Sequence, residues 1–296
     1  AGKRFGIPVL GTMAHSWVMS FDEEIDAFRE YVRQYHDNLI LLADTYNVLE
    51  MGVPHAIQVF KELKEEGRLP GKYGIRIDSG DIAYLSQEAT RMFTEAGFPD
   101  AIISGSNDLD EYTIQSLKAQ GCTVTSWGVG TKIITADGTS ALGGVFKMAV
   151  KETDGKEVPV MKFSNDVEKM TNPGIKTVYR FYKKDTGKMI TDLVCLHDEK
   201  AADGGDFTLV TESAKWRRKE LKAGTYTVEE LLKPVVENGR NLPLPALSEI
   251  IRYADKQIDT LWPEYTRLLN PDLMEINLSD KLQTLKSELI RRELGE

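Results

Sequence analysis

Short apolar runs alternate with amphipathic stretches through the first half of the chain. The runs IPVL, NLILLA, YGIRI, DAIIS and TVTSW have the length and composition of buried strands. Between them lie SFDEEIDAFREYVRQY, PHAIQVFKELKEEGR, IAYLSQEATRMFTEAG and DEYTIQSLKAQG, where apolar residues recur as on one face of a helix. This alternation predicts an α/β domain over residues 1–149, built on a parallel barrel or a doubly wound sheet.

The pattern changes from Gly144 onward. The segments GGVFKMAV, VPVMKF, KTVYRFY and MITDLVCL alternate lysines and apolar residues with a period near two, and turn sequences such as Thr153-Asp154-Gly155 join them. We therefore expect a mostly antiparallel, β-rich region over residues 150–224. After Thr225 the segments VEELLKPVVENG, LSEIIRYADKQIDTLW and LSDKLQTLKSELIRRELG predict a C-terminal helical region over residues 225–296, with Ser279 as an N-cap.

Polar clusters follow the predicted strands of the first region, in the segments GTMAHS, LLADTY, GIRIDSGD, IISGSND and SWGVGT. The carboxyl ends of parallel strands meet at one edge of a sheet or one end of a barrel, where α/β enzymes assemble their sites. These clusters therefore predict one shared polar site.

His15 stands in the first cluster, after a short apolar run and among small residues. A hydrogen-bonded structural histidine would explain it. An imidazole, with its unperturbed pKa of about 6.5, can also exchange protons or accept a phosphoryl group at neutral pH. The other three histidines, His36, His55 and His197, match no catalytic motif, and we assign them to structure or surface.

Arg76 and Asp78 alternate with Ile75 and Ile77, so on a strand the two polar side chains share one face. A buried ion pair is one explanation. The other is a ligand site, in which the guanidinium binds phosphate or carboxylate and the carboxylate binds a ring or the ribose hydroxyls. Asp78 could instead hold Mg²⁺ through water, because Mg²⁺ commonly combines a carboxylate with substrate phosphates.

The other strand ends carry weaker signals. Asp44 suits either a helix cap or a ligand contact. In SNDLDE we expect Asp108 to be the N-cap of the following helix, and Asp110 and Glu111 to interact favourably with the positive end of its dipole. Gly105 allows close backbone approach, and the Ser106 hydroxyl can donate to phosphate.

The segment GVGT is too short to identify a dinucleotide fold. Its place after the last strand predicts a phosphate clamp made by backbone N–H groups, Thr131 and Lys132. Lys147, in LGGVFK, could reach the same pocket, although a hairpin explains the glycines of that segment more simply.

Composition excludes several classes of partner. The formal net charge is -9 and the isoelectric point is about 5.2, which disfavours nucleic acid and anionic membranes as partners. No apolar run approaches the roughly 20 residues that a membrane span needs. Two cysteines among apolar or β-branched neighbours fit reduced, structural thiols, so we expect a cytoplasmic protein.

The clusters GTMAHS, GIRIDSGD, ISGSNDLDE, WGVGTKIIT and LGGVFK, in this order, resemble the nicotinate phosphoribosyltransferase family. The resemblance implies an irregular parallel α/β barrel of the type II phosphoribosyltransferase kind, with an appended, mostly antiparallel β region and C-terminal helices. It also implies the ATP-coupled synthesis of nicotinate mononucleotide from nicotinate and phosphoribosyl pyrophosphate, a step of NAD salvage. Members of the family carry a substantial region before the first motif, so Ala1 is expected to be an internal position.

The resemblance further implies roles for individual residues. His15 would be phosphorylated by ATP. Mg²⁺ is the expected cofactor, and no residue is assigned as a direct metal ligand. A homodimer is expected, with the N-terminal segment missing or present as a separate chain. The expected catalytic residues are His15, Arg76 and Asp78, and the expected substrate-binding residues are Asp44, Ser79, Gly105, Ser106, Gly128, Gly130, Thr131 and Lys147.

Three alternatives remain open at this level. A nicotinamide phosphoribosyltransferase resembles the chain at the histidine and at the Arg-x-Asp-Ser-Gly motif, although GTMAHS and WGVGT favour the nicotinate branch. A different barrel enzyme acting on a phosphosugar would explain the strand-end glycines. A catalytically inert, phosphate-binding fragment would follow from the missing N-terminal region.

Overall fold

The computed structural model describes residues 2–164, 169–201, 205–211 and 216–295. Ala1, expected to be an internal position, lies outside the described residues. The chain divides into two compact units, Ala1–Gly143 and Gly144–Glu296. The division falls within LGGVFK, so the strand-end motifs up to GVGT belong to the first unit and Lys147 belongs to the second.

A four-stranded parallel sheet forms the centre of the first unit, in the order β1-β2-β3-β4. Its strands are β1 (Leu39–Leu42), β2 (Tyr73–Ile77), β3 (Ile102–Gly105) and β4 (Ser126–Trp127). Strands β1, β2 and β4 fall within NLILLA, YGIRI and TVTSW, and β3 overlaps DAIIS and ends one residue later, so these four predictions are confirmed. The register places Leu42 beside Arg76 and Arg76 beside Ser104, which brings the carboxyl ends of the first three strands together.

The prediction of a strand at IPVL is wrong. These residues follow α1 (Gly2–Phe5) in an extended segment that is not assigned to a strand. Val9 is 79% exposed and Leu10 is 86% exposed. A strand forms only where a neighbouring strand makes hydrogen bonds with its backbone N–H and C=O groups. No strand of the four-stranded sheet pairs with IPVL.

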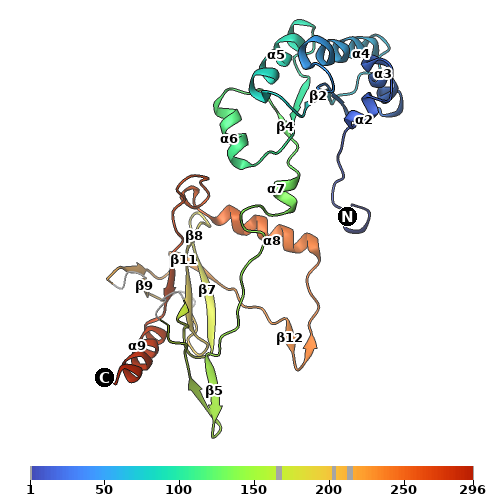
Figure 1. Ribbon diagram of the computed structural model, residues 1–296. Coiled ribbons are helices and arrows are strands. Elements are labelled where there is room, and N and C mark those ends of the chain that lie inside the picture. Colours follow the sequence, from blue (N-terminus) through green and yellow to red (C-terminus); the bar gives the residue numbers. More distant parts are fainter. Residues whose placement is uncertain (1, 165–168, 202–204, 212–215, 296) are drawn as a thin grey trace. The chain divides into compact units, whose positions relative to one another are not determined.

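Besides α1, the first unit contains the helices α2 (His15–Val18), α3 (Glu24–Gln34), α4 (Val53–Glu65), α5 (Ile82–Glu95), α6 (Glu111–Ala119) and α7 (Thr131–Ile134), with a π-helical turn η1 (Val48–Gly52) before α4. Helices α4 and α5 pack against β2 (Figure 1). The rings of Phe60, Tyr73, Phe93 and Phe98 meet in the core between them, with centroids 5.1 to 6.2 Å apart. Burial of these large side chains anchors the helices to the sheet.

Aspartate side chains cap the starts of α5 and α6. The Asp81 carboxylate accepts a hydrogen bond from the Tyr84 backbone N–H at the start of α5. The cap of α6 is Asp110, which accepts from Thr113, and the prediction of Asp108 as this cap is wrong. Asp108 lies in the loop before this helix, where its backbone N–H donates a hydrogen bond to the side chain of Asn107. The helix begins at Glu111.

The second unit contains a six-stranded sheet in the order β10-β9-β14-β8-β7-β11. Its strands are β7 (Lys176–Lys183), β8 (Met189–Leu196), β9 (Phe207–Thr211), β10 (Arg218–Leu221), β11 (Tyr226–Glu230) and β14 (Ile276–Leu278). All pairings are antiparallel except that of β14 with β8. Helix α9 (Asp280–Leu294) packs against β8 (Figure 1), and Ser279 caps it by accepting from the Leu282 N–H, as predicted.

Smaller elements complete this unit. A hairpin of β5 (Val150–Thr153) and β6 (Lys156–Pro159) turns through Asp154 and Gly155, both with positive φ. A second hairpin joins β12 (Val236–Glu237) and β13 (Arg240–Asn241), and α8 (Leu247–Thr260) and the short η3 (Pro263–Tyr265) follow it. None of the helices in the described ranges is long and apolar enough to cross a membrane.

Two further predictions for the second unit are wrong. The helix expected at VEELLKPVVENG is replaced by β11 and the second hairpin, because Tyr226 to Glu230 pair along their whole length with β7 and bury Tyr226. Such a tertiary pairing outweighs the helical spacing of a short segment. The strand expected at GGVFKMAV begins only at Val150, and Val145 and Phe146 are exposed.

Candidate active site

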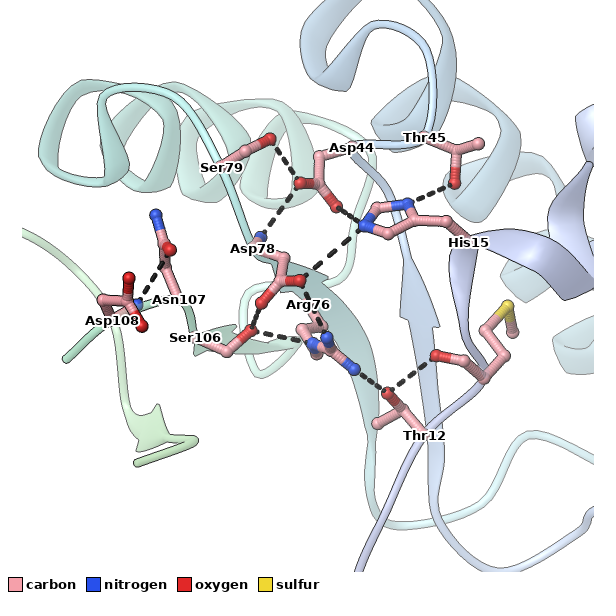
Figure 2. A network of polar contacts seen from close by, with 11 residues as sticks. Thr12, His15, Asp44, Thr45, Arg76, Asp78, Ser79, Ser106, Asn107 and Asp108 are labelled. Carbon is pink, nitrogen blue, oxygen red and sulfur yellow. Dashed lines mark hydrogen bonds and ion pairs between the residues drawn. The ribbon is translucent and has the colours of Figure 1, made fainter. Parts of the chain in front are cut away.

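Polar side chains from three strand ends form one network in the first unit (Figure 2). Asp44 follows β1, Asp78 follows β2 and Ser106 follows β3. Because the strands are parallel and in register, these ends lie at the same edge of the sheet. The predicted shared site is therefore present for these residues.

Strand β2 presents opposite chemistry on its two faces. Ile75 and Ile77 are fully buried in the core, whereas Arg76 points to the other face and is partly exposed. The alternation predicted from the sequence is confirmed, and it follows from the period of two in a strand. The arginine therefore belongs to the site and not to the core.

Arg76 is held by three polar contacts. Its Nε donates to Ser106 Oγ over 2.8 Å, and its Nη1 donates to Thr12 Oγ1 over 2.7 Å. Its Nη2 lies 3.0 Å from Asp78 Oδ2 in an ion pair. A planar guanidinium can satisfy all three partners at once, which fixes the orientation of its positive charge.

Asp78 remains a carboxylate through its partners. Burial alone would raise its pKa, but the hydrogen bond from Ser106 Oγ, the charge and hydrogen bond of Arg76, and the charge of His15 together lower the pKa below its ordinary value. The single proton of the Ser106 hydroxyl goes to Asp78 Oδ1 in this arrangement. Ser106 therefore connects the arginine to the aspartate.

Asp44 lies deeper, with its side chain only 2% exposed. Its Oδ2 accepts from Ser79 Oγ over 2.6 Å and from the Asp78 backbone N–H over 3.2 Å. Its Oδ1 is buried and accepts no hydrogen bond from any part of the chain that the structure describes. It faces His15 Nε2 at 3.9 Å. Asp44 thus contacts both the segment after β2 and the imidazole, and it caps no helix.

His15 begins α2, and its side chain is 40% exposed. Its Nδ1 lies 3.0 Å from Thr45 Oγ1, within hydrogen-bonding distance. Its Nε2 lies 3.7 Å from Asp78 Oδ2 and 3.9 Å from Asp44 Oδ1. An accessible imidazole between two carboxylates and a hydroxyl group can take part in proton or phosphoryl transfer.

The network joins six of the predicted site residues: His15, Asp44, Arg76, Asp78, Ser79 and Ser106. Gly105 lies in β3 beside them. A Cβ atom on Gly128 would lie 3.1 Å from Ser106 Cβ, so this glycine also borders the network.

Three predicted residues do not join it. Gly130 precedes α7 and Thr131 begins it, and neither takes part in the polar network among the described residues. Lys147 belongs to the second unit and is exposed. The neighbouring Lys132 is paired with Asp137 over 2.6 Å.

Two members of the network were not predicted. Thr12 binds Arg76, and Thr45 binds His15. Both residues lie in motifs that the sequence analysis had selected, Thr12 in GTMAHS near His15 and Thr45 in LLADTY next to Asp44. This proximity in sequence is the signal that could have identified them. Threonine is common in strands and turns, and its type alone does not mark it as functional.

A second histidine of the first unit, His55, is partly buried. His55 Nδ1 contacts Glu24 Oε2 at 2.7 Å, which fits the structural role assigned to His55. Burial raises the pKa of Glu24 above its ordinary value, although the hydrogen bond and charge of His55 act in the opposite direction. This pair supports α3 and α4, where the two residues lie.

The fold and the site define a class: an α/β protein whose polar site is assembled at the carboxyl ends of parallel strands. Comparison with known proteins makes the relationship specific. Residues 175–286 match the family model described as nicotinate phosphoribosyltransferase C-terminal domain.

Similarity to individual proteins covers almost the whole chain. It is 39% identical, over 98% of its length, to nicotinate phosphoribosyltransferase of Bacillus subtilis (strain 168). It is 31% identical, over 95% of its length, to nicotinate phosphoribosyltransferase 2 of Arabidopsis thaliana. It matches the crystal structure of human nicotinic acid phosphoribosyltransferase with a TM-score of 0.75 and 27% identity, over 97% of this chain. The resemblance to nicotinate phosphoribosyltransferase that the motifs indicate is confirmed.

The chain spans 58%, 60% and 63% of the lengths of these three proteins, respectively. The similarity therefore concerns a portion of each relative.

Proposed function

We propose that this chain carries the phosphoribosyl-transfer and ATP-coupling site of a nicotinate phosphoribosyltransferase. The reaction converts nicotinate, phosphoribosyl pyrophosphate, ATP and water into nicotinate mononucleotide, pyrophosphate, ADP and phosphate, and serves NAD salvage. The observation that carries the proposal is the placement of His15 between Asp44 and Asp78, beside the Arg76–Ser106 pair. The curated relatives are named for nicotinate, so the nicotinamide alternative is not favoured.

For the transfer step, the protein must bind and orient two substrates. Carbon C1 of the ribose passes through an oxocarbenium-like state, and no side-chain nucleophile on C1 is required. We assign Arg76 and Asp78 to the base or ribose region, because their charges are fixed by the network. Asp44 Oδ2 accepts hydrogen bonds from the backbone N–H of Asp78 and from the hydroxyl of Ser79, so it fixes the segment that carries Asp78.

The phosphate of the substrate is assigned to Gly105, Ser106, Gly128, Gly130 and Thr131. The absence of a side chain at Gly128 leaves room against Ser106, which supports this assignment. The proton of Ser106 Oγ is committed to Asp78, so Ser106 would act here mainly by holding the Arg76–Asp78 pair. Lys147 is also assigned to phosphate binding, and this assignment rests only on its place in the motif LGGVFK.

Magnesium fits the carboxylates of this site. Among the described residues no group of three or more potential ligands could hold a metal, so the protein would supply one or two carboxylates and the substrates would supply phosphate oxygens. Asp78 and the Oδ1 atom of Asp44, which accepts no hydrogen bond among the described residues, are the groups that would hold it. The ion would neutralise the charge of the departing pyrophosphate and of the ATP phosphates.

For energy coupling, His15 is the proposed nucleophile toward the γ-phosphorus of ATP. Cleavage of the resulting phosphohistidine would help drive synthesis of the mononucleotide. We further propose that the parallel sheet is part of an irregular barrel of the type II phosphoribosyltransferase kind. A homodimer and a cytoplasmic location complete the proposal.

The decisive experiment incubates the chain with labelled ATP, nicotinate, phosphoribosyl pyrophosphate and Mg²⁺, and measures nicotinate mononucleotide by chromatography. His15→Ala is the test variant, and His36→Ala, at an exposed position outside the network, is the matched control. We expect ATP-dependent product from the wild type and the control, and loss of the ATP dependence in His15→Ala. Replacing nicotinate with nicotinamide in the same assay tests whether the enzyme prefers the acid or the amide as its substrate.

If no product forms while phosphoribosyl pyrophosphate still binds, the chain is a binding portion of a larger enzyme. Failure to bind phosphoribosyl pyrophosphate would contradict the assignment of the site.

A further inference from the structure

Helix α8 of the second unit is attached to its sheet by polar contacts. Arg180 Nη1, on β7, donates to the side-chain oxygen of Gln257 over 2.7 Å. Lys188 Nζ donates to the backbone carbonyls of Asp259 and Leu261, over 2.9 and 3.0 Å, at the end of the helix. None of the residues of α8, all of which the structure describes, is buried. Packing within the chain therefore does not explain why this helix carries large aliphatic side chains.

Four of these side chains form one line along the helix, which we call the α8 stripe. Leu247, Ile251, Ala254 and Ile258 are spaced by four, three and four residues, which places them on one side of a helix. The three large members are 43% to 59% exposed. Gln257, which contacts the sheet, lies roughly a quarter turn away around the helix axis. The contacts that attach α8 to the sheet therefore leave the stripe free.

The spacing of the α8 stripe is palindromic, so the stripe is complementary to a second copy of itself. In an antiparallel pair of helices, Leu247 of one copy lies opposite Ile258 of the second copy. Ile251 then lies opposite Ala254 of the second copy. A large side chain meets a small one in the middle of the pair, so the two helices can approach closely. A symmetric dimer requires this self-complementarity, because both copies use the same surface.

The positions beside the α8 stripe bring no like charges together. Ser248 and Asp255 flank the stripe on one side, and Ile250 and Gln257 flank it on the other. Antiparallel pairing sets Ser248 against Asp255 of the second copy. It likewise sets Ile250 against Gln257. Electrostatic repulsion therefore does not oppose this pairing.

The exposed apolar area around the α8 stripe is as large as that of a dimer interface. The segment that precedes α8, with the hairpin at β12 (Figure 1), adds Val235, Val236 and Leu244, each more than half exposed. Ile250 and Tyr253 on α8 are each 48% exposed. At roughly 90 Å² for a half-exposed large side chain, these residues and the stripe present about 700 Å². A standard interface buries about 800 Å² on each partner, whereas the largest apolar patch of a typical monomer is roughly 300 to 600 Å².

We propose that the α8 stripe is the surface on which a second copy of this chain docks, with the two α8 helices antiparallel about a two-fold axis. This inference rests on the homodimer of the proposed function and names the surface that forms it. Gln257 and Lys188 hold the helix in place through their hydrogen bonds, and the apolar side of the helix binds the second copy.

Analytical ultracentrifugation over a range of micromolar concentrations tests the surface. Ile251→Glu places a charge in the interface twice, because each copy contributes the residue. Leu294→Glu, at an exposed position at the end of α9, is the matched control. We expect dimers from the wild type and the control, and a dissociation constant about 100-fold larger for Ile251→Glu. Far-UV circular dichroism checks that the helix content of the variants is unchanged.

Disulfide cross-linking tests the antiparallel arrangement. Leu247→Cys and Ile258→Cys proteins, mixed until their subunits exchange and then oxidised, should form a covalent dimer, because the two positions face each other. Either protein alone should form much less, since equal positions of the two helices lie about 16 Å apart, too far for a disulfide. The oxidised wild type is the control for the native Cys122 and Cys195.

Three results would overturn the inference. The first is a wild type that stays monomeric, including one whose α8 amides are protected from hydrogen exchange because the stripe is covered within a single chain. The second is a dimer that Ile251→Glu does not weaken. The third is a covalent dimer of Leu247→Cys alone at the yield of the mixture, because the helices would then not be antiparallel.

Nicotinate mononucleotide, measured on the same samples, separates this inference from the proposed function. Product from a wild type whose dimer survives Ile251→Glu overturns the role of the α8 stripe and leaves the proposed reaction standing. A dimer that depends on Ile251 and forms no product supports the role of the stripe and counts against the proposed reaction.

Discussion

Arg76 donates from Nε to the hydroxyl of Ser106 over 2.8 Å, which joins β2 to the residue after β3. The same hydroxyl donates a hydrogen bond to Asp78, so the serine lies between a cation and an anion that also contact each other directly. This triangle presents fixed charges at the edge of the sheet. A preorganised site of this kind does not have to rearrange when a charged substrate binds.

Arg76→Lys should reduce kcat/KM for phosphoribosyl pyrophosphate by about 100-fold. A lysine ammonium keeps the charge but cannot reach Ser106, Thr12 and Asp78 with the geometry of a planar guanidinium. Steady-state kinetics with varied phosphoribosyl pyrophosphate measures the change. Arg91→Lys, on the exposed side of α5, is the control and should behave as the wild type. Equal kinetics in the two variants would show that charge alone matters at position 76.

Gly128→Ala should weaken binding of phosphoribosyl pyrophosphate by about tenfold, through displacement of Ser106. The new Cβ would lie 3.1 Å from Ser106 Cβ, closer than ordinary carbon contacts, so the serine must move. Isothermal titration calorimetry measures the affinity. Gly71→Ala serves as control, because a Cβ at Gly71 meets no atom within 4 Å. Wild-type affinity in Gly128→Ala would remove this glycine from the site.

Gly74→Ala should destabilise the first unit by about 3 kcal/mol or more. Gly74 pairs with Ile102, and a Cβ on it would lie only 1.9 Å from the carbonyl oxygen of Ile102. Neither strand can shift far without breaking the ladder between β2 and β3. Urea unfolding measures the free energy, again with Gly71→Ala as the control. A difference below about 1 kcal/mol would mean that the strands accommodate the methyl group.

Glu24→Gln should make stability less dependent on pH. The folded-state pKa of Glu24 lies above its ordinary value of 4.5, so the folded state binds its proton more tightly than the unfolded state does. The contribution of Glu24 is therefore fully present below pH 4.5 and is lost as the pH rises through the folded-state pKa. Glutamine does not titrate.

Urea unfolding of both proteins from pH 4 to pH 8 measures this difference. The free energy of unfolding of the wild type, relative to Glu24→Gln, should fall as the pH rises. Glu65→Gln, at an exposed position near the end of α4, is the control for loss of a carboxylate. Parallel pH profiles for the wild type and Glu24→Gln would contradict the prediction.

Local patterns were sufficient for most of the first unit. Strand β2 coincides with YGIRI, and its alternation correctly placed Arg76 opposite Ile75 and Ile77. Helix α5 begins at Ile82, the first residue of the predicted segment IAYLSQEATRMFTEAG, and the Asp81 side chain caps it. These features depend on neighbours in sequence, through the periods of strands and helices and through capping, and a single sequence therefore contains them.

Features that depend on distant partners were predicted less well. IPVL and VEELLKPVVENG have plausible strand and helix patterns, but the first finds no neighbouring strand and the second contains residues that pair with β7. The steric role of Gly74 is also invisible in the sequence, because the atom it avoids belongs to Ile102 on another strand.

The sequence by itself pointed to the side chains that the structure brings into one polar network, because His15, Asp44, Arg76 and Asp78 stand in recognisable motifs around the strands. Only the tertiary structure decided how they are connected: Ser106 joins the arginine to the aspartate, and Thr45 holds Nδ1 of His15. The physical reason is that hydrogen bonds require a distance and a direction. Both are set by the parallel register of β1, β2 and β3, which arises only when the whole sheet has formed.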